Sequence, residues 1–212
     1  MSSNRVFAIA SITALLKQLL NNEIVQQFAH APVGDVLVTS LPPDRIKLDT
    51  EERAQLNLYL YRVTPNTTRQ SVSMFAGQAG NTTRLPLALD LHYLLAAYGE
   101  KELQPDILLG CAAQLFHDNP MISASMLHTQ LTTTRTSGSA DPLLEIITAS
   151  TTSENLSAIK IVPEFLDIDQ LSKLWASWQA HARPALTYQV SMALVGDDEL
   201  RAEQGQTVGA AR

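Results

Sequence analysis

The chain has 212 residues, of which 45% are hydrophobic and 17% are charged, a composition that excludes a largely disordered protein. This length suits one domain that buries about 70% of the surface of its unfolded chain. The net charge of −6 offers no basic stripe for a phosphate backbone, so we expect no nucleic-acid partner. The single cysteine, Cys111, excludes an internal disulfide and a site built from several thiolates.

The first segment is predicted to be a helix over residues 4–28. Apolar residues recur at helical spacing from Val6 to Leu20, which favours an amphipathic helix over a signal peptide. No run approaches the roughly 20 apolar residues that span a bilayer. We therefore expect a protein that is made in the cytoplasm without a signal peptide and that does not insert into a membrane.

Two long apolar segments predict the main strands. Residues 55–63 are apolar on both faces, which indicates a strand that is covered on both sides. In residues 85–98, leucines alternate with Ala88, Asp90 and His92, which is also typical of a strand. A short strand over 36–40, a turn at the two prolines that follow, and a charged loop precede them.

The second half adds two helices and further strands. The predicted elements are a helix over 104–117, an edge strand at 143–148 inside a loop rich in Ser and Thr, a strand over 159–162, a helix capped by Asp167 or Asp169, and a strand over 186–195. This order predicts an α+β domain over residues 1–195, with helices on a mixed and largely antiparallel sheet. Residues 196–212 are polar and are expected to form a tail or arm.

Asp90 and His92 are the best candidates for catalysis. Residues two apart on a strand project to the same face, and a carboxylate beside an imidazole is the orienting half of a catalytic triad. No nucleophile elbow accompanies them, so the favoured interpretation is a polar pair satisfied within the sheet or at a subunit contact.

The other reactive residue types favour structural roles. Cys111 lies on the apolar stripe of its predicted helix, which is typical of a buried and unreactive thiol. The five histidines show no HxxxH or HExxH spacing. Trp175 and Trp178 share a helix face with two leucines, which favours a place in the core. The sequence thus predicts no catalytic residues, no cofactor and no metal site.

Five segments together carry a family resemblance. They are residues 39–44 (TSLPPD), 55–66 (QLNLYLYRVTPN), 85–99 (LPLALDLHYLLAAYG), VPE at 162–164 leading into LSKLW at 171–175, and RP at 183–184 leading into YQVS at 188–191. In this order and spacing the chain resembles the cap, or tail-terminator, proteins of phage-tail-like extracellular contractile injection systems. The resemblance covers roughly residues 5–195.

The resemblance implies structural work rather than catalysis. Members of the family form a sixfold ring that sits on the last ring of the inner tube, at the end distal to the baseplate. The ring ends tube growth and meets the last sheath layer. The implied partners are therefore further copies of this chain, in a homohexamer, together with the inner-tube protein and the sheath protein.

Two other functions remain open at this point. One is a small cytosolic enzyme, hydrolase-like, that uses Asp90 and His92, and the other is an adaptor near the baseplate of the same particle. For the cap, the candidate interface residues are Leu41, Pro42, Pro43, Asp44, Asn66, Asp90, His92, Gly196, Asp197 and Asp198.

Overall fold

The computed structural model describes residues 7–28, 35–46, 53–68, 87–123, 126 and 158–194. Its elements are α1 (Ala8–Phe28), β1 (Leu37–Thr39), the short 3-10 helix η2 (Pro43–Arg45), β2 (Gln55–Pro65), β3 (Leu87–Tyr98), α3 (Gln104–Asp118), β4 (Met121–Ile122), β5 (Ile159–Glu164), α6 (Ile168–Ser177) and β6 (Ala185–Leu194). The strands form one sheet in the order β1-β2-β3-β6-β5-β4. β1 and β2 run parallel and all other neighbours are antiparallel, which confirms the predicted α+β fold with its mixed sheet.

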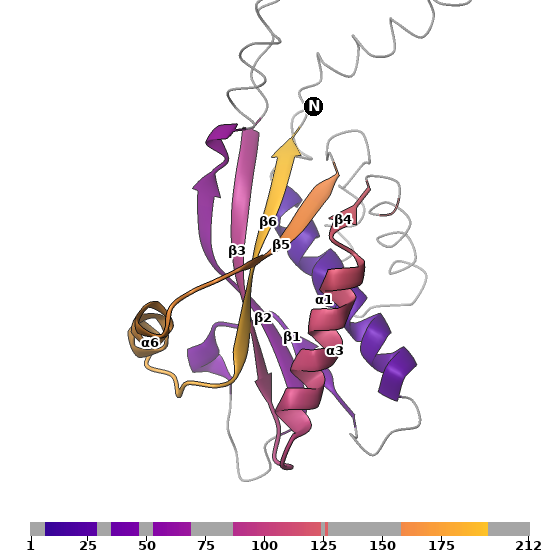
Figure 1. Ribbon diagram of the computed structural model, residues 1–212, viewed down its shortest axis with the longest axis vertical. Helices are drawn as coiled ribbons and strands as arrows, with labels where there is room; N and C mark the ends of the chain where they lie inside the picture. The colour runs from indigo at the N-terminus through magenta and orange to yellow at the C-terminus, as the bar shows by residue number, and fades with distance from the viewer. Residues whose placement is uncertain are drawn as a thin grey trace, which may run out of the picture.

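Helices α1 and α3 cover one face of this sheet (Figure 1). Apolar residues of α1 at helical spacing, Ile12, Leu15, Leu16 and Leu20, are at most 1% exposed and pack with alternate residues of the central strands. Tyr93 of β3 is fully buried there, and its hydroxyl lies 2.8 Å from the hydroxyl of Thr13. This layer is the main hydrophobic core.

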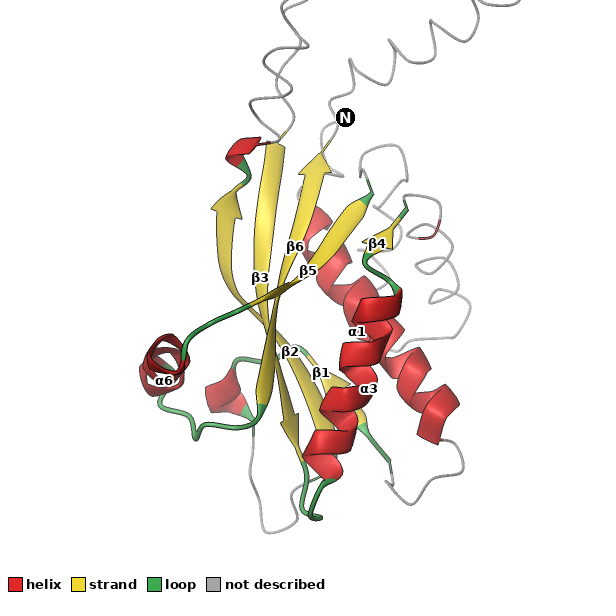
Figure 2. Cartoon of the chain, viewed as in Figure 1, coloured by secondary structure: helices red, strands yellow, loops and turns green. Residues whose placement is uncertain are grey.

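Helix α6 lies on the opposite face, with the short helix η2 beside it (Figure 2). It covers a smaller cluster built on Leu94, Ala96 and Tyr98 of β3, with Trp175 from the helix itself. Trp175 is 3% exposed, which confirms its predicted place in a core. Trp178 is half-buried and packs edge-on against Trp175, with ring centroids 5.8 Å apart. These residues form a second hydrophobic cluster, separate from the main core.

The structure also refines several predicted boundaries. Asp167, and not Asp169, caps α6. β2 lies between β1 and β3, but it is not covered on both faces along its whole length as predicted, because Arg62 and Val63 are exposed. The sequence does not predict β4, because two residues are too short to show an alternating pattern. The predicted strand at 143–148 and the tail at 196–212 lie outside the described residues.

Candidate functional site

A bulge in β2 gathers polar side chains on the α6 face. Leu60 pairs with Tyr93 of β3, and Arg62 pairs with the next residue, His92, so Tyr61 is an extra residue in β2. One extra residue shifts the alternation of side chains by one position. As a result Tyr61 and Arg62 both contact residues on the α6 side of the sheet, where Tyr61 also packs against the apolar cluster.

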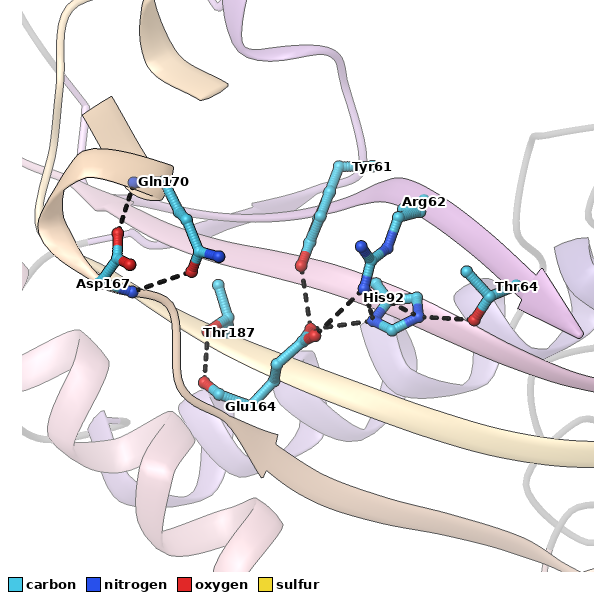
Figure 3. A network of polar contacts seen from close by, with 8 residues as sticks. All are labelled: Tyr61, Arg62, Thr64, His92, Glu164, Asp167, Gln170 and Thr187. Atoms are coloured by element: carbon cyan, nitrogen blue, oxygen red, sulfur yellow. Dashed lines mark hydrogen bonds and ion pairs between the residues drawn. The ribbon is translucent and has the colours of Figure 1, made fainter. Parts of the chain in front are cut away.

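His92 is the centre of the resulting network (Figure 3). Its side chain is nearly buried, and its Nδ1 lies 2.9 Å from Oε2 of Glu164. Its Nε2 lies 2.9 Å from the hydroxyl of Thr64. A carboxylate only accepts hydrogen bonds, so Nδ1–H of His92 donates to Glu164. The guanidinium of Arg62 lies 3.4 Å from both His92 Nδ1 and Glu164 Oε1.

Glu164 ties the end of β5 to its neighbours. The hydroxyl of Tyr61 donates to Glu164 Oε2 at 2.9 Å, and the hydroxyl of Thr187 in β6 donates to the backbone carbonyl of Glu164. Burial, and then the hydrogen bond and charge of Glu164, raise the pKa of the Tyr61 hydroxyl well above its usual value. Tyr61 therefore acts as a fixed donor, and one carboxylate joins β2, β3 and β5.

Asp90 belongs to a separate polar group. Its carboxylate accepts hydrogen bonds from Asn66 Nδ2 at 2.9 Å and from Ser191 Oγ at 2.6 Å. Asp90 and His92 share a face, as their spacing predicts, but the carboxylate that contacts the imidazole is Glu164. Asp90 and His92 thus each find their own partners on the sheet, and the carboxylate–imidazole pair is formed by residues that are 72 positions apart in the chain.

The order Glu164, His92, Thr64 is that of a carboxylate, an imidazole and a hydroxyl in a catalytic triad. Acyl transfer also needs an exposed nucleophile and unpaired donors for the oxyanion. Thr64 is half-buried within β2, where it pairs with Asp90 of β3, so the backbone beside it belongs to the sheet ladder. This geometry suits a structural interlock between strands better than it suits nucleophilic catalysis.

The first group of predicted interface residues follows β1. The buried side chain of Asn57 holds this segment, because its amide accepts from Leu41 N and donates to Leu41 O, each at 2.9 Å. Leu41 and Asp44 are exposed, whereas Pro43 is buried against the chain itself. The structure thus presents a fixed loop whose contacts stay a prediction. The predicted interface residues Gly196, Asp197 and Asp198 lie outside the described residues.

The remaining candidates for chemistry are the single cysteine and any group of metal-ligating side chains. Cys111 of α3 is buried, and burial, with a smaller effect from the negative charge of Glu23, raises the pKa of its thiol. Within the described ranges, no three His, Cys, Asp or Glu side chains gather as metal ligands do. Among the helices of those ranges, none is long and apolar enough to cross a membrane.

Sequence reasoning missed four members of the network, namely Tyr61, Arg62, Thr64 and Glu164. All four lie in segments that carry the family resemblance, but they come together only through the bulge and the strand order. A bulge leaves no mark in the alternation of residues 55–63, which is apolar on both faces. No signal in the sequence pairs Glu164 with His92.

These features define a class: an α+β domain with polar side-chain networks between its strands and, among the described residues, an exposed loop after β1 that Asn57 holds in place. Residues 11–208 match the family model described as the Pvc16 N-terminal domain, so the chain belongs to this family. Among curated proteins, no relative was found.

Two solved structures are similar to the chain. One is the sheath/tube terminator of the PVC extracellular contractile injection system in its extended state, with 12% identity, a TM-score of 0.44, and coverage of 84% of this chain and 56% of that one. The other is the tube-terminating cap of the anti-feeding prophage, with 13% identity, a TM-score of 0.46, and coverage of 84% and 54%. The chain therefore spans about half the length of these two proteins.

Proposed function

We propose that this chain is the structural cap of a contractile, phage-tail-like injection particle, where it ends the inner tube. The observation that carries this proposal is the family match over residues 11–208. The cap-like motifs support it, because residues 55–66 and 85–99 hold β2 and β3, the two longest strands of the sheet. The motifs thus coincide with the scaffold of the domain.

In this function, six copies form a ring on the last layer of the inner tube, distal to the baseplate. A closed ring requires contact between two different patches of each copy. Six copies would carry six times −6, or −36, so the acidic surfaces must face solvent or basic partner residues. The ring also contacts the last sheath layer and thereby links sheath to tube.

The cap acts through protein contacts, with no cofactor and no catalytic step. Electron microscopy of particles from a strain that lacks this chain tests the proposal. We expect tubes of uncontrolled length, or sheath that has separated from the tube. Particles of normal length with an attached sheath would overturn it. A label on the chain must also appear at the end distal to the baseplate, since a label at the baseplate would indicate an adaptor instead.

One observation favours a second candidate, an acyl hydrolase: the triad-like order of Glu164, His92 and Thr64. Replacing His92 with Gln and Thr64 with Val separates the two functions. A hydrolase predicts that the purified chain cleaves an activated ester such as p-nitrophenyl acetate, and that either variant abolishes turnover while it remains folded. The cap predicts no turnover in the unaltered chain and capped particles with a folded Thr64→Val variant.

A further inference from the structure

Two large apolar side chains project from the junction between β5 and α6. Phe165 is 92% exposed and Ile168 is 81% exposed, the two highest values among the exposed large hydrophobic residues described. We call residues 165–168 the knuckle. Single exposed apolar residues are common, but an aromatic ring and an isoleucine this exposed and this close together are typical of an interaction site.

The knuckle is held rigidly at both ends. On one side, Glu164 is fixed by His92, Tyr61 and Thr187. On the other side, Asp167 and Gln170 form a reciprocal capping box: Gln170 N donates to Asp167 Oδ1 at 2.7 Å, and Asp167 N donates to Gln170 Oε1 at 3.1 Å (Figure 3). A backbone segment that is fixed before binding loses little entropy when it binds. The polar network and the capping box thus hold the knuckle in one conformation before a partner binds.

Charge indicates what kind of partner fits. The exposed carboxylates of Asp167 and Asp169 flank Ile168, so a matching surface is apolar and carries a cation at its rim. This chain has such a surface at the opposite end of β5. Met121 is 62% exposed and pairs across β4 and β5 with the exposed Lys160.

We call Met121, Lys160 and Val162 the corner. Val162 is 38% exposed and lies two residues from Lys160 in the same strand, so both project to the same face. Met121 is the direct cross-strand partner of Lys160 and shares that face. The flexible thioether of methionine adapts to an aromatic ring. Met121 and Lys160 lie at the start of β5 and Phe165 follows its last residue, so about 16 Å of extended chain separates Lys160 from Phe165, and Val162 lies between them.

We infer that the knuckle of one copy docks on the corner of a second copy, with Phe165 against Met121 and the carboxylates beside Lys160. The two patches differ, which is what the head-to-tail contacts of a ring require. This inference rests on the proposed cap function, because it names a self-contact of the ring. His92 and Glu164 act in it as positioning residues.

The first experiment measures association of the full chain by sedimentation. Phe165→Ser removes the knuckle and Lys160→Glu reverses the charge of the corner, and each is expected to weaken association at least about tenfold. Leu103→Ser and Lys173→Glu are matched controls, because Leu103 is 62% exposed elsewhere and Lys173 is an exposed cation on α6. The controls are expected to associate like the unaltered chain.

Complementation then tests the pairing of the two patches. Phe165→Ser keeps its corner and Lys160→Glu keeps its knuckle, so an equal mixture of the two variants is expected to form mixed complexes that neither forms alone. Asp169→Lys is expected to associate weakly alone and to regain association when it is mixed with Lys160→Glu. Three results would each overturn the inference. The unaltered chain could stay monomeric, Phe165→Ser could associate normally, or the mixtures could stay monomeric.

A further variant tests whether association depends on how Phe165 is positioned as well as on its presence. Glu164→Ala leaves Phe165 in place but frees one end of the knuckle, and it is expected to weaken association while the chain stays folded. Particles distinguish failure of this inference from failure of the cap function. If particles without the chain are uncapped but particles with Phe165→Ser are normal, the cap stands and the contact is wrong.

Discussion

The two faces of strand β3 show how one segment serves two purposes. On one face, Leu91 and Leu95 are fully buried beneath the layer of α1 and α3. On the other, Leu94 and Ala96 lie under α6, and farther along the strand Asp90 and His92 lie in hydrogen-bonded groups. The first face depends on apolar area and volume, whereas the second depends on particular partners. We therefore expect substitutions on the two faces to lower the free energy of unfolding by different amounts and for different physical reasons.

Adjacent leucines offer the largest test of this comparison. Leu94 and Leu95 are both fully buried and face opposite sides of the sheet. Replacing Leu95 with Ala leaves a cavity between the sheet and two helices and is expected to cost about 3–5 kcal/mol of unfolding free energy. Replacing Leu94 with Ala is expected to cost about 2–3 kcal/mol, because a single short helix relaxes more easily onto the cavity. Urea unfolding measures both.

Leu89→Ala is a suitable control, since Leu89 is only partly buried against the main core. It is expected to cost less than Leu95→Ala. Equal losses for the variants at Leu94 and Leu95 would mean that α6 packs as firmly as α1 and α3, and the two faces would then differ only in their polar groups.

The next prediction concerns the polar interlock. Glu164→Ala removes the acceptor for the hydroxyl of Tyr61 and for Nδ1 of His92, so one partly buried donor and one buried donor lose their partner. Leaving such groups unpaired is expected to cost about 1–3 kcal/mol. Glu164→Gln keeps one acceptor oxygen and is expected to lose less. If urea unfolding places both variants within about 0.5 kcal/mol of the unaltered chain, the network contributes no net stability.

The sequence predicts the first kind of face better than the second. Helical spacing in α1 and alternation in β3 follow directly from what must be buried, so these elements are found with small errors at their ends. The network depends on a one-residue bulge at Tyr61 and on β6 lying between β3 and β5. Neither is a local property of the sequence. The spacing of Asp90 and His92 therefore predicts two polar residues on one face, but it does not predict their partners.

The next prediction concerns the loss of folding stability at alkaline pH, to which the buried hydroxyl of Tyr93 contributes. Burial raises the pKa of the Tyr93 hydroxyl above its ordinary value of about 10, so the folded chain keeps this proton while the unfolded chain releases it. Its contribution to stability is therefore fully present below about pH 10 and is lost as the pH rises, by up to about 1.4 kcal/mol per pH unit. Unfolding free energies from about pH 8 to about pH 11 measure this slope.

Tyr93→Phe is expected to flatten that slope, although it also loses the contact with Thr13 and is less stable at neutral pH. Tyr61→Phe is the comparison on the other face, where burial and Glu164 raise the pKa of the hydroxyl in the same direction. An unchanged slope in Tyr93→Phe would assign the alkaline loss of stability to other groups.

The smallest expected effect lies at the start of α6. Asp167→Ala removes the side-chain acceptor from Gln170 N and half of the capping box, which is expected to cost about 1 kcal/mol. Asp169→Ala is the matched control, because Asp169 lies in the same first turn but does not cap the helix. Hydrogen exchange of the α6 amides is the sensitive measurement. Faster exchange in Asp167→Ala, with the amides of α1 and α3 unchanged, would show that α6 opens independently of the main core. The knuckle would then loosen without loss of the fold, which is the behaviour expected of a binding element on the less heavily packed face.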